Sequence, residues 1–367
     1  MNKRILFALL VSMATVVVAC SQPASISRQE ATDSERPRAL AAMVKAQAGF
    51  VYTADERGNS ISVTDLATGQ VKTIGTPITP HNVQASSDGR LLLAVGEVEK
   101  KDDRTGPAEA AMGGMERGRL LLFHTRGMNL DSALEVELGR DPAHVVVDSN
   151  DRLAYVTNSM DSDLAIVDLR QGKVISTVAT GKMPHGLRMS PDGREIYIAN
   201  VKDDSVSVID VGQSKEVARI AVGKAPVQVG FTPDGSLVYV SLRDENSVAV
   251  VDTAQRRKIA KVPVGRNPIQ VFVTPNGRFA YVANQGTQAN PDNTVSVIST
   301  ASNSVIATIT TGQGAHGVVV SDDGSRVFIT NTEDGTVSVI DTATQKVIDT
   351  FKVGKGPNGI TFRSATR

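Results

Sequence analysis

Short apolar runs separated by turn residues recur along most of the chain. In the middle of the sequence, residues 196–200, 205–210 and 217–220 form three such runs, each with the length and composition of a β-strand. A further run precedes them in the same unit, so each unit predicts four strands. The turn glycines of three successive units are 42 residues apart, at Gly193, Gly235 and Gly277. A strand-built repeat of this period is typical of a β-propeller blade.

The units also predict how the ring closes. The last unit, from Gly356, has no strand after its innermost one, while residues 50–54 form a second strand with none before it. Antiparallel pairing of these two segments would leave no open sheet edge. We therefore expect an all-β fold, a seven-bladed β-propeller of four-stranded antiparallel blades over residues 49–367, closed by its N-terminal and C-terminal strands. The innermost strands are expected to begin near His81, Ala143, His185, Val227, Ile269, His316 and Asn358.

The repeated motifs resemble a known family. Tyr-Val-Thr-Asn at residues 155–158, Val-Ile-Asp at 208–210 and Ser-Pro-Asp-Gly at 190–193 resemble the YVTN-repeat β-propellers, which include YncE-like and surface-layer-like proteins. The resemblance covers residues 50 to about 363. It implies a propeller of WD40-like repeats, but it implies little about activity, because propellers host binding, scaffolding and catalysis.

Composition argues against one function that this resemblance implies. Single-stranded DNA binding is a property found within the YncE-like group. This chain, however, carries 39 Lys and Arg residues against 39 Asp and Glu residues and has no tryptophan. It therefore lacks the basic bias and the stacking platforms of a nucleic-acid binder, and we expect no nucleic-acid partner.

The N-terminus predicts export. Residues 1–19 have a basic start and an apolar run that is short for a membrane span, so they read as a signal peptide. The run ends at Cys20, the only cysteine, in a context that resembles the bacterial lipoprotein cleavage box. We expect Cys20 to carry lipid, such as palmitate, and residues 20–48 to be a flexible tether. Ser21 indicates the outer membrane, facing the periplasm, if the organism is Gram-negative.

Four of the five histidines fall at the start of innermost strands, on one rim of the central channel. Histidine is a common ligand of transition metals, so this rim could hold copper, zinc or haem iron. Alternatively, Pro-His-Gly is a repeat turn in which the imidazole bonds to the backbone. We expect a geometric obstacle to a shared ion, because three of the histidines lie on blades separated by one blade each. The candidate ligands are His81, His144, His185 and His316.

Five cations lie on the same rim, each after the glycine that ends an outermost strand. A ring of cations could bind an anion. Neighbouring loops of the rim, however, carry carboxylates such as Asp161, Asp204 and Glu245, and we favour mutual neutralisation over an anion site. The cations are Arg140, Lys182, Lys224, Arg266 and Lys355.

A long insertion interrupts the symmetry of the repeats. Residues 97–117 lengthen one loop of the rim and include Met112 and Met115. Long loops on a functional face commonly contact partners. The two thioethers could bind copper, but we favour packing or partner contact for them.

The sequence leaves three functional hypotheses. The first is a lipid-anchored, non-catalytic binding or scaffold protein for a protein or small-ligand partner at the rim. The second is a metal- or haem-binding redox or metal-handling propeller that uses the rim histidines. A lactonase-like hydrolase is weaker, since it rests on other seven-bladed propellers. We find no Ser-His-Asp set, and we interpret strand-closing aspartates such as Asp168 and Asp341 as turn caps.

Overall fold

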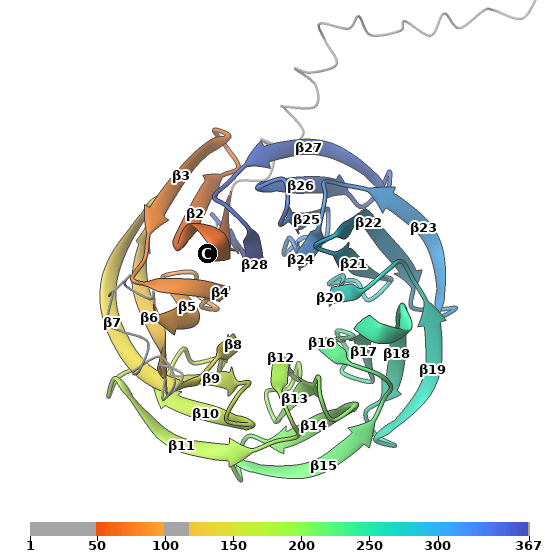
Figure 1. The fold of residues 1–367 in the computed structure, drawn as a ribbon, viewed down its shortest axis with the longest axis horizontal. Helices are drawn as coiled ribbons and strands as arrows, with labels where there is room; N and C mark the ends of the chain where they lie inside the picture. The colour runs from red at the N-terminus through yellow and green to blue at the C-terminus, as the bar shows by residue number, and fades with distance from the viewer. Residues whose placement is uncertain (1–48, 99–116, 366–367) are drawn as a thin grey trace, which may run out of the picture. The chain divides into compact units, whose positions relative to one another are not determined.

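The computed structural model describes residues 49–98 and 117–365, which form seven four-stranded antiparallel sheets around a central axis (Figure 1). This confirms the predicted β-propeller. We number the blades in chain order, with the blade that contains both ends as blade 1. Blade 1 contains β28 (Pro357–Ser364), β1 (Gly49–Asp55), β2 (Ser60–Asp65) and β3 (Gln70–Gly75). Blade 2 contains β4 (Ile78–Ala85), β5 (Leu91–Val98), β6 (Arg117–Arg126) and β7 (Asn129–Arg140). Blade 3 contains β8 (Pro142–Val147), β9 (Leu153–Asn158), β10 (Asp163–Asp168) and β11 (Lys173–Ala179).

The other four blades repeat the same order from the axis outward. Blade 4 contains β12 (Pro184–Met189), β13 (Glu195–Asn200), β14 (Ser205–Asp210) and β15 (Lys215–Ala221), and blade 5 contains β16 (Pro226–Phe231), β17 (Leu237–Leu242), β18 (Ser247–Asp252) and β19 (Arg257–Pro263). Blade 6 contains β20 (Pro268–Val273), β21 (Phe279–Thr287), β22 (Asn290–Ser299) and β23 (Ser304–Thr310). Blade 7 contains β24 (Ala315–Val320), β25 (Arg326–Asn331), β26 (Thr336–Asp341) and β27 (Lys346–Lys352).

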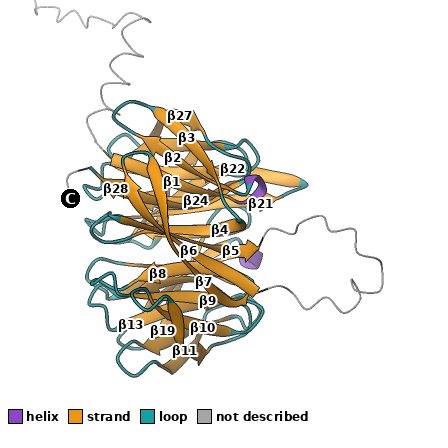
Figure 2. Cartoon of the chain, turned by 90° about the vertical axis from the view of Figure 1, so that its left-hand side faces the viewer, coloured by secondary structure: helices purple, strands orange, loops and turns teal. Residues whose placement is uncertain are grey.

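Within residues 49–98 and 117–365, the helical content is two single turns, η1 (Glu56–Gly58) and η3 (Arg243–Glu245). Both turns and the long β21–β22 hairpin project on one side of the ring (Figure 2). That side is the rim where the second strands end and the innermost strands begin. In the part of the chain that the structure describes, no helix is long and apolar enough to cross a membrane. Cys20, Met112 and Met115 lie outside the described residues.

Hydroxyl and carboxylate side chains fix the turns, as predicted for the aspartates. In blade 4, Ser190 donates to Asp192 at 2.6 Å and accepts from the N–H of Glu195 at 3.0 Å, while Gly193 takes a φ of 72° that favours glycine. At the next turn, the carboxylate of Asp210 accepts from the N–H of Gln213 at 2.7 Å. Asp168, Asp252 and Asp341 accept backbone N–H bonds in the same way. These carboxylates hold the repeat together and are not paired for catalysis.

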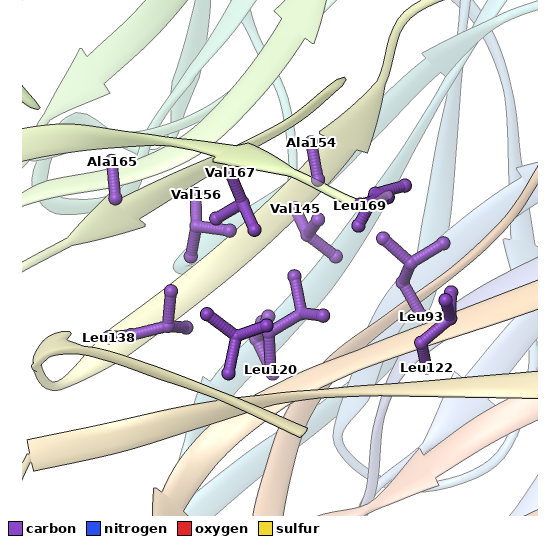
Figure 3. Close-up of a cluster of buried hydrophobic side chains, with 12 residues drawn as sticks. Leu93, Leu120, Leu122, Leu138, Val145, Ala154, Val156, Ala165, Val167 and Leu169 are labelled. Atoms are coloured by element: carbon purple, nitrogen blue, oxygen red, sulfur yellow. The ribbon is translucent and has the colours of Figure 1, made fainter. Parts of the chain in front are cut away.

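The hydrophobic core is divided among the interfaces between blades. Each pair of neighbouring blades encloses one cluster of buried side chains. Figure 3 shows the cluster between blades 2 and 3, where apolar residues of the two facing sheets interdigitate. The labelled members are Leu93, Leu120, Leu122 and Leu138 of blade 2, and Val145, Ala154, Val156, Ala165, Val167 and Leu169 of blade 3. Because every cluster needs two blades, the ring must close for all of them to be buried.

The two ends of the chain close the ring in blade 1, as the sequence predicts. Strand β1 pairs with β28 in antiparallel register, with Val51 opposite Phe362 and Thr53 opposite Ile360. Ile360 and Phe362 then pack with residues of blade 7 in the last interface cluster. The two strands at the ends of the described chain therefore complete both a sheet and a core.

The last position of the Tyr-Val-Thr-Asn motif is a buried hydrogen-bonding site. In blade 4, the Nδ2 group of Asn200 donates to Ser205 at 3.0 Å and to Ser207 at 2.9 Å. In blade 1 the corresponding residue is Asp55, which is fully buried and accepts from Ser62 at 2.6 Å. Burial raises the pKa of Asp55 to about 6, although the hydrogen bonds that the carboxylate accepts lower it in part. The folded protein therefore carries an ionised carboxylate here at a cost in free energy.

Asp55→Asn is expected to increase the free energy of unfolding at pH 8 by about 2–3 kcal/mol, since one pKa unit corresponds to about 1.4 kcal/mol. The pKa of Asp55 in the folded protein lies above its ordinary value, so the wild type loses stability as the pH rises from about 4 to about 6. Asparagine cannot ionise. Urea denaturation of both proteins at about pH 4 and at pH 8 measures the difference. The gain should vanish at about pH 4, and an equal gain at both pH values would contradict this account.

Candidate functional site

The four rim histidines lie near the beginning of innermost strands. His81, His185 and His316 directly follow Pro80, Pro184 and Ala315 on β4, β12 and β24. His144 lies one position further along β8. Strands β4, β8 and β12 belong to three successive blades (Figure 1), whereas β24 belongs to blade 7. The fold therefore places His81, His144 and His185 on one arc of the axis.

Three of these imidazoles converge. The Nε2 atoms of His81 and His185 lie 3.1 Å apart, and one nitrogen from each of His81, His144 and His185 can be chosen so that all three lie within 4.8 Å of one another. Their ring centres are 4.8–5.6 Å apart. The expected geometric obstacle is therefore wrong for His81 and His185, which meet although blade 3 lies between them. The position equivalent to theirs on blade 3 is Ala143, whose methyl group occupies little space.

His316 does not join this group. Its ring is buried, and its Nδ1 atom has no hydrogen-bond partner among the described residues. Burial lowers its pKa to about 4, helped by the charge of His81, while the charge of Glu56 acts in the opposite direction. The structure thus brings together three of the four candidate ligands and leaves the fourth apart.

The outer nitrogens of two imidazoles are held by acceptors. Nδ1 of His81 lies 3.0 Å from a carboxylate oxygen of Glu56, whose other oxygen accepts from Asn358 at 2.6 Å. Nδ1 of His185 lies 3.2 Å from the carbonyl oxygen of Val227. Because a carboxylate and a carbonyl can only accept, each Nδ1 carries a proton. The Nε2 atom of neutral His185 then presents a lone pair, whereas the Nε2 atom of His81 presents one only when His81 lacks a second proton. Neither ring nitrogen of the fully buried His144 has a hydrogen-bond partner within the described chain.

The environment sets the charge of each group. Burial alone would lower the pKa of His81, but the charge and hydrogen bond of Glu56 outweigh it and raise the pKa. Burial would raise the pKa of Glu56, yet His81 and the hydrogen bond from Asn358 lower it to about 2. Burial, and then the charge of His81, lower the pKa of His185 to about 3. Burial also lowers the pKa of His144 well below its usual range. His144 and His185 are therefore neutral, as metal ligands must be, whereas His81 has to lose its second proton before it can bind a metal ion.

The repeat itself positions these strands. The Thr157 hydroxyl, from the Tyr-Val-Thr-Asn motif of blade 3, donates to the carbonyl of His185 at 2.7 Å and accepts from the N–H of His144 at 3.1 Å. A Cβ atom at Gly186, which follows His185, would collide with the carbonyl oxygen of Val227 and with the side chain of Gln228. The Pro-His-Gly turn thus lets adjacent blades approach closely beside the cluster.

Comparison with known proteins identifies the family of this fold. The family model described as "YNCE-like beta-propeller" matches residues 132–366. The chain belongs to the YNCE-like β-propeller family. No curated protein matches its sequence.

Solved structures similar to this YNCE-like propeller have varied descriptions. Hydrazine synthase of Kuenenia stuttgartiensis has a TM-score of 0.65 at 19% identity, over 78% of this chain and 96% of that one. A functionally unknown protein of Desulfotomaculum acetoxidans has a TM-score of 0.69 at 16% identity, over 86% and 99%. A candidate 6-phosphogluconolactonase of Bacteroides fragilis has a TM-score of 0.66 at 15% identity, over 86% and 98%. At these identities the likeness shows the fold alone.

The rim cations of this YNCE-like propeller lie beside carboxylates. Arg140 pairs with Asp161 at 2.6 Å, Lys224 with Asp204 at 2.5 Å, and Arg266 with Asp292 at 3.3 Å. Within the described residues, Lys182 and Lys355 form no ion pair. Three of the five predicted cations thus have a carboxylate partner, and the rim does not present five unpaired charges to an anion.

Sequence reasoning did not single out Glu56 and Asn358. Glu56 follows the second strand of blade 1, and Asn358 occupies on β28 the position that His81 and His185 occupy on β4 and β12. Both residues also line a cavity of about 310 Å³ beside the β21–β22 hairpin. The repeat already predicted that Asn358 starts an innermost strand at the position of the histidines, but it gave Asn358 no role at the site. Nothing local marks Glu56, which meets His81 only because the ring closes.

Proposed function

We propose that this YNCE-like propeller is a metal-binding protein that holds one transition-metal ion on His81, His144 and His185. The observation that carries the proposal is the pair of Nε2 atoms 3.1 Å apart. Glu56 and the carbonyl of Val227 accept hydrogen bonds from the two Nδ1 atoms. With both rings neutral, two lone pairs would face each other and repel, so either a second proton on His81 or a metal ion must lie beside them. A carboxylate or carbonyl on the outer nitrogen is the usual setting of a metal-bound imidazole.

The spacing suits a small ion bound by imidazoles. Nitrogens bound to tetrahedral zinc at about 2.0–2.1 Å lie about 3.3 Å from one another. The separation between His81 and His185 is close to this value, and His144 supplies a third nitrogen within 4.8 Å. Imidazole ligands favour zinc and copper. Two imidazoles at 3.1 Å leave no space for a porphyrin between them, so we favour a bare ion over haem.

The proposal joins two hypotheses from the sequence. Three imidazoles leave a fourth coordination position, which a water molecule or a small ligand would fill. The protein would then act as a metal-dependent binding protein at the rim of an exported propeller. The signal peptide and Cys20 support a location at a membrane through a lipid anchor, facing the periplasm in a Gram-negative cell. The likeness to a candidate lactonase carries only the fold and adds no support for hydrolysis.

Calorimetric titration of metal-free, full-length protein with Zn²⁺ and with Cu²⁺ tests the proposal. We expect one ion to bind per chain. Because the folded state alone holds the three nitrogens together, an ion at 100 times its dissociation constant should stabilise the fold by about 2.7 kcal/mol. Absence of saturable binding would contradict the proposal and would leave a shared proton as the cation between His81 and His185.

Glu56→Gln is expected to weaken zinc binding by about 10- to 100-fold, because a neutral amide orients the His81 ring less firmly and makes its Nε2 less basic. Competition with a chromophoric chelator measures the change. Glu333→Gln is the matched control, since this carboxylate lines the same cavity but pairs with Arg57 at 3.0 Å. An equal loss in both variants would show that Glu56 does not act through His81.

A further inference from the structure

The opposite end of the axis from the histidines contains a second hollow, which the proposed function does not use. Two cavities of about 320 and 170 Å³ adjoin there and share Arg188, Met189 and Phe272. Between them they are lined by the later residues of the innermost strands of all seven blades. Most of the lining residues are apolar, such as Val146, Phe231, Val319 and Phe362, and the larger cavity also has a polar part formed by Gln84, Arg188, Asp322 and Thr361.

Arg188 is the cation in this apolar wall. It is the fourth residue after Pro184 on β12, a position that the other innermost strands fill with Gln84, Val146, Gly230, Phe272, Val319 and Thr361. The blade between Arg188 and Phe272 carries Gly230, so no side chain separates the guanidinium from the ring, whose centre lies 5.7 Å away. Among these seven positions Arg188 is the one charged residue, and an aromatic face lies beside it.

The guanidinium has no countercharge. Within the described residues, Nη1 of Arg188 donates to the carbonyl of Leu187 at 3.1 Å, which uses one of the five N–H groups of the guanidinium. Within the described chain no carboxylate forms an ion pair with Arg188, and this includes Asp322, the acidic residue of the wall. Burial lowers the pKa of Arg188 to about 10, and no acidic neighbour offsets that effect. The Arg188 side chain is partly buried, and a bound anion would supply the countercharge that the wall does not.

The two ends of the axis are separated by packed side chains. Asn82, His144, Gln228 and Gln270 each occupy the second position after the turn on their innermost strands, between the histidine end and Arg188, and none is more than 5% exposed. The amide oxygen of Gln270 accepts from the N–H of Val318 at 3.1 Å on the neighbouring blade. The second hollow is therefore a site of its own and not an extension of the histidine cluster.

We propose that this hollow binds a monocarboxylate with an apolar body, of the medium-chain fatty-acid type. The carboxylate lies against Arg188, whose planar fork matches two carboxylate oxygens. The hydrocarbon lies against Phe272 and the aliphatic wall. A volume of about 320 Å³ falls at the lower end of the range of small-molecule sites, which run from about 300 to 1,000 Å³. The opposite charge and the apolar lining together select this class over neutral or cationic lipids.

Calorimetric titration of metal-free, full-length protein with decanoate tests the proposal, with decanol as the neutral probe of the same length. We expect one decanoate per chain. Arg188→Met should weaken binding by about 30-fold or more, since losing one partner of a buried charge pair costs at least about 2 kcal/mol. The affinity of decanol for the wild type should not exceed the affinity of decanoate for Arg188→Met. Arg194→Met, at a mostly exposed arginine of the same blade, should leave decanoate binding unchanged.

Three results would overturn this second site. They are no saturable binding of decanoate, decanol binding as tightly as decanoate, or decanoate affinity retained in a folded Arg188→Met variant. If Arg188→Met does not fold, Arg188→Lys keeps the charge but loses the fork, and it should weaken binding by about 10-fold.

Discussion

His144→Ala is expected to weaken zinc binding by at least about 100-fold, more than the loss of a supporting residue would cause. The His144 ring is fully buried, and neither of its nitrogens has a hydrogen-bond partner among the described residues. Removing the ring therefore breaks no hydrogen bond of the ring and acts mainly on the metal. Two imidazoles, those of His81 and His185, would remain to hold the ion. Competition titration with a chromophoric chelator measures the loss.

Two further variants make this result specific. His144→Leu should lose zinc binding equally but keep the stability of the metal-free fold, because an apolar side chain replaces a buried polar group without partners. His124→Ala should leave affinity unchanged, since His124 is exposed on the third strand of blade 2. If His124→Ala and His144→Ala weakened zinc binding alike, the ion would not bind at the cluster.

Deletion of residues 357–367 is expected to abolish a single cooperative unfolding transition and to cause aggregation. Strand β28 supplies the innermost strand of blade 1, and its loss exposes the edge of β1. It also removes Ile360 and Phe362 from the interface with blade 7, and full burial of such side chains contributes about 1.5–3 kcal/mol each. These losses, together with the strand pairing, rival the total stability of a typical domain, about 5–15 kcal/mol.

The matched control is deletion of residues 365–367, which keeps the whole of β28. Thermal unfolding followed by circular dichroism compares the two proteins. The shorter deletion should melt like the full chain. A sharp, unchanged transition after the longer deletion would contradict closure of the ring by the two ends of the chain.

The repeat predicted the fold because turn chemistry and strand length are local. Ser190, Asp192 and Gly193 close a turn with their own side chains and backbone, so the motif specifies its structure wherever it occurs. Pairing of the two ends also followed from the sequence, since a lone innermost strand and a lone second strand complete one blade. Both inferences needed only the order of strands in a unit.

The candidate site was only partly predictable, because it depends on side chains from different blades. The histidine positions were visible in the sequence, but the meeting of His81 and His185 depends on the small residue Ala143 at the equivalent position between them. The carboxylate that accepts from His81 belongs to Glu56, which follows β1 in the blade that closes the ring. Arg188 was also visible in the sequence, but its lack of a countercharge became apparent only once the wall around it was known.

X-ray absorption spectroscopy at the zinc edge of the zinc-loaded, full-length protein tests the central claim most directly. Coordination by His81, His144 and His185 predicts three imidazole nitrogens at about 2.0–2.1 Å and one further light ligand. His144→Ala should reduce the number of imidazoles to two. A first shell of oxygen atoms without imidazole scattering, or a spectrum that His144→Ala leaves unchanged, would contradict the claim that the three histidines form a metal site.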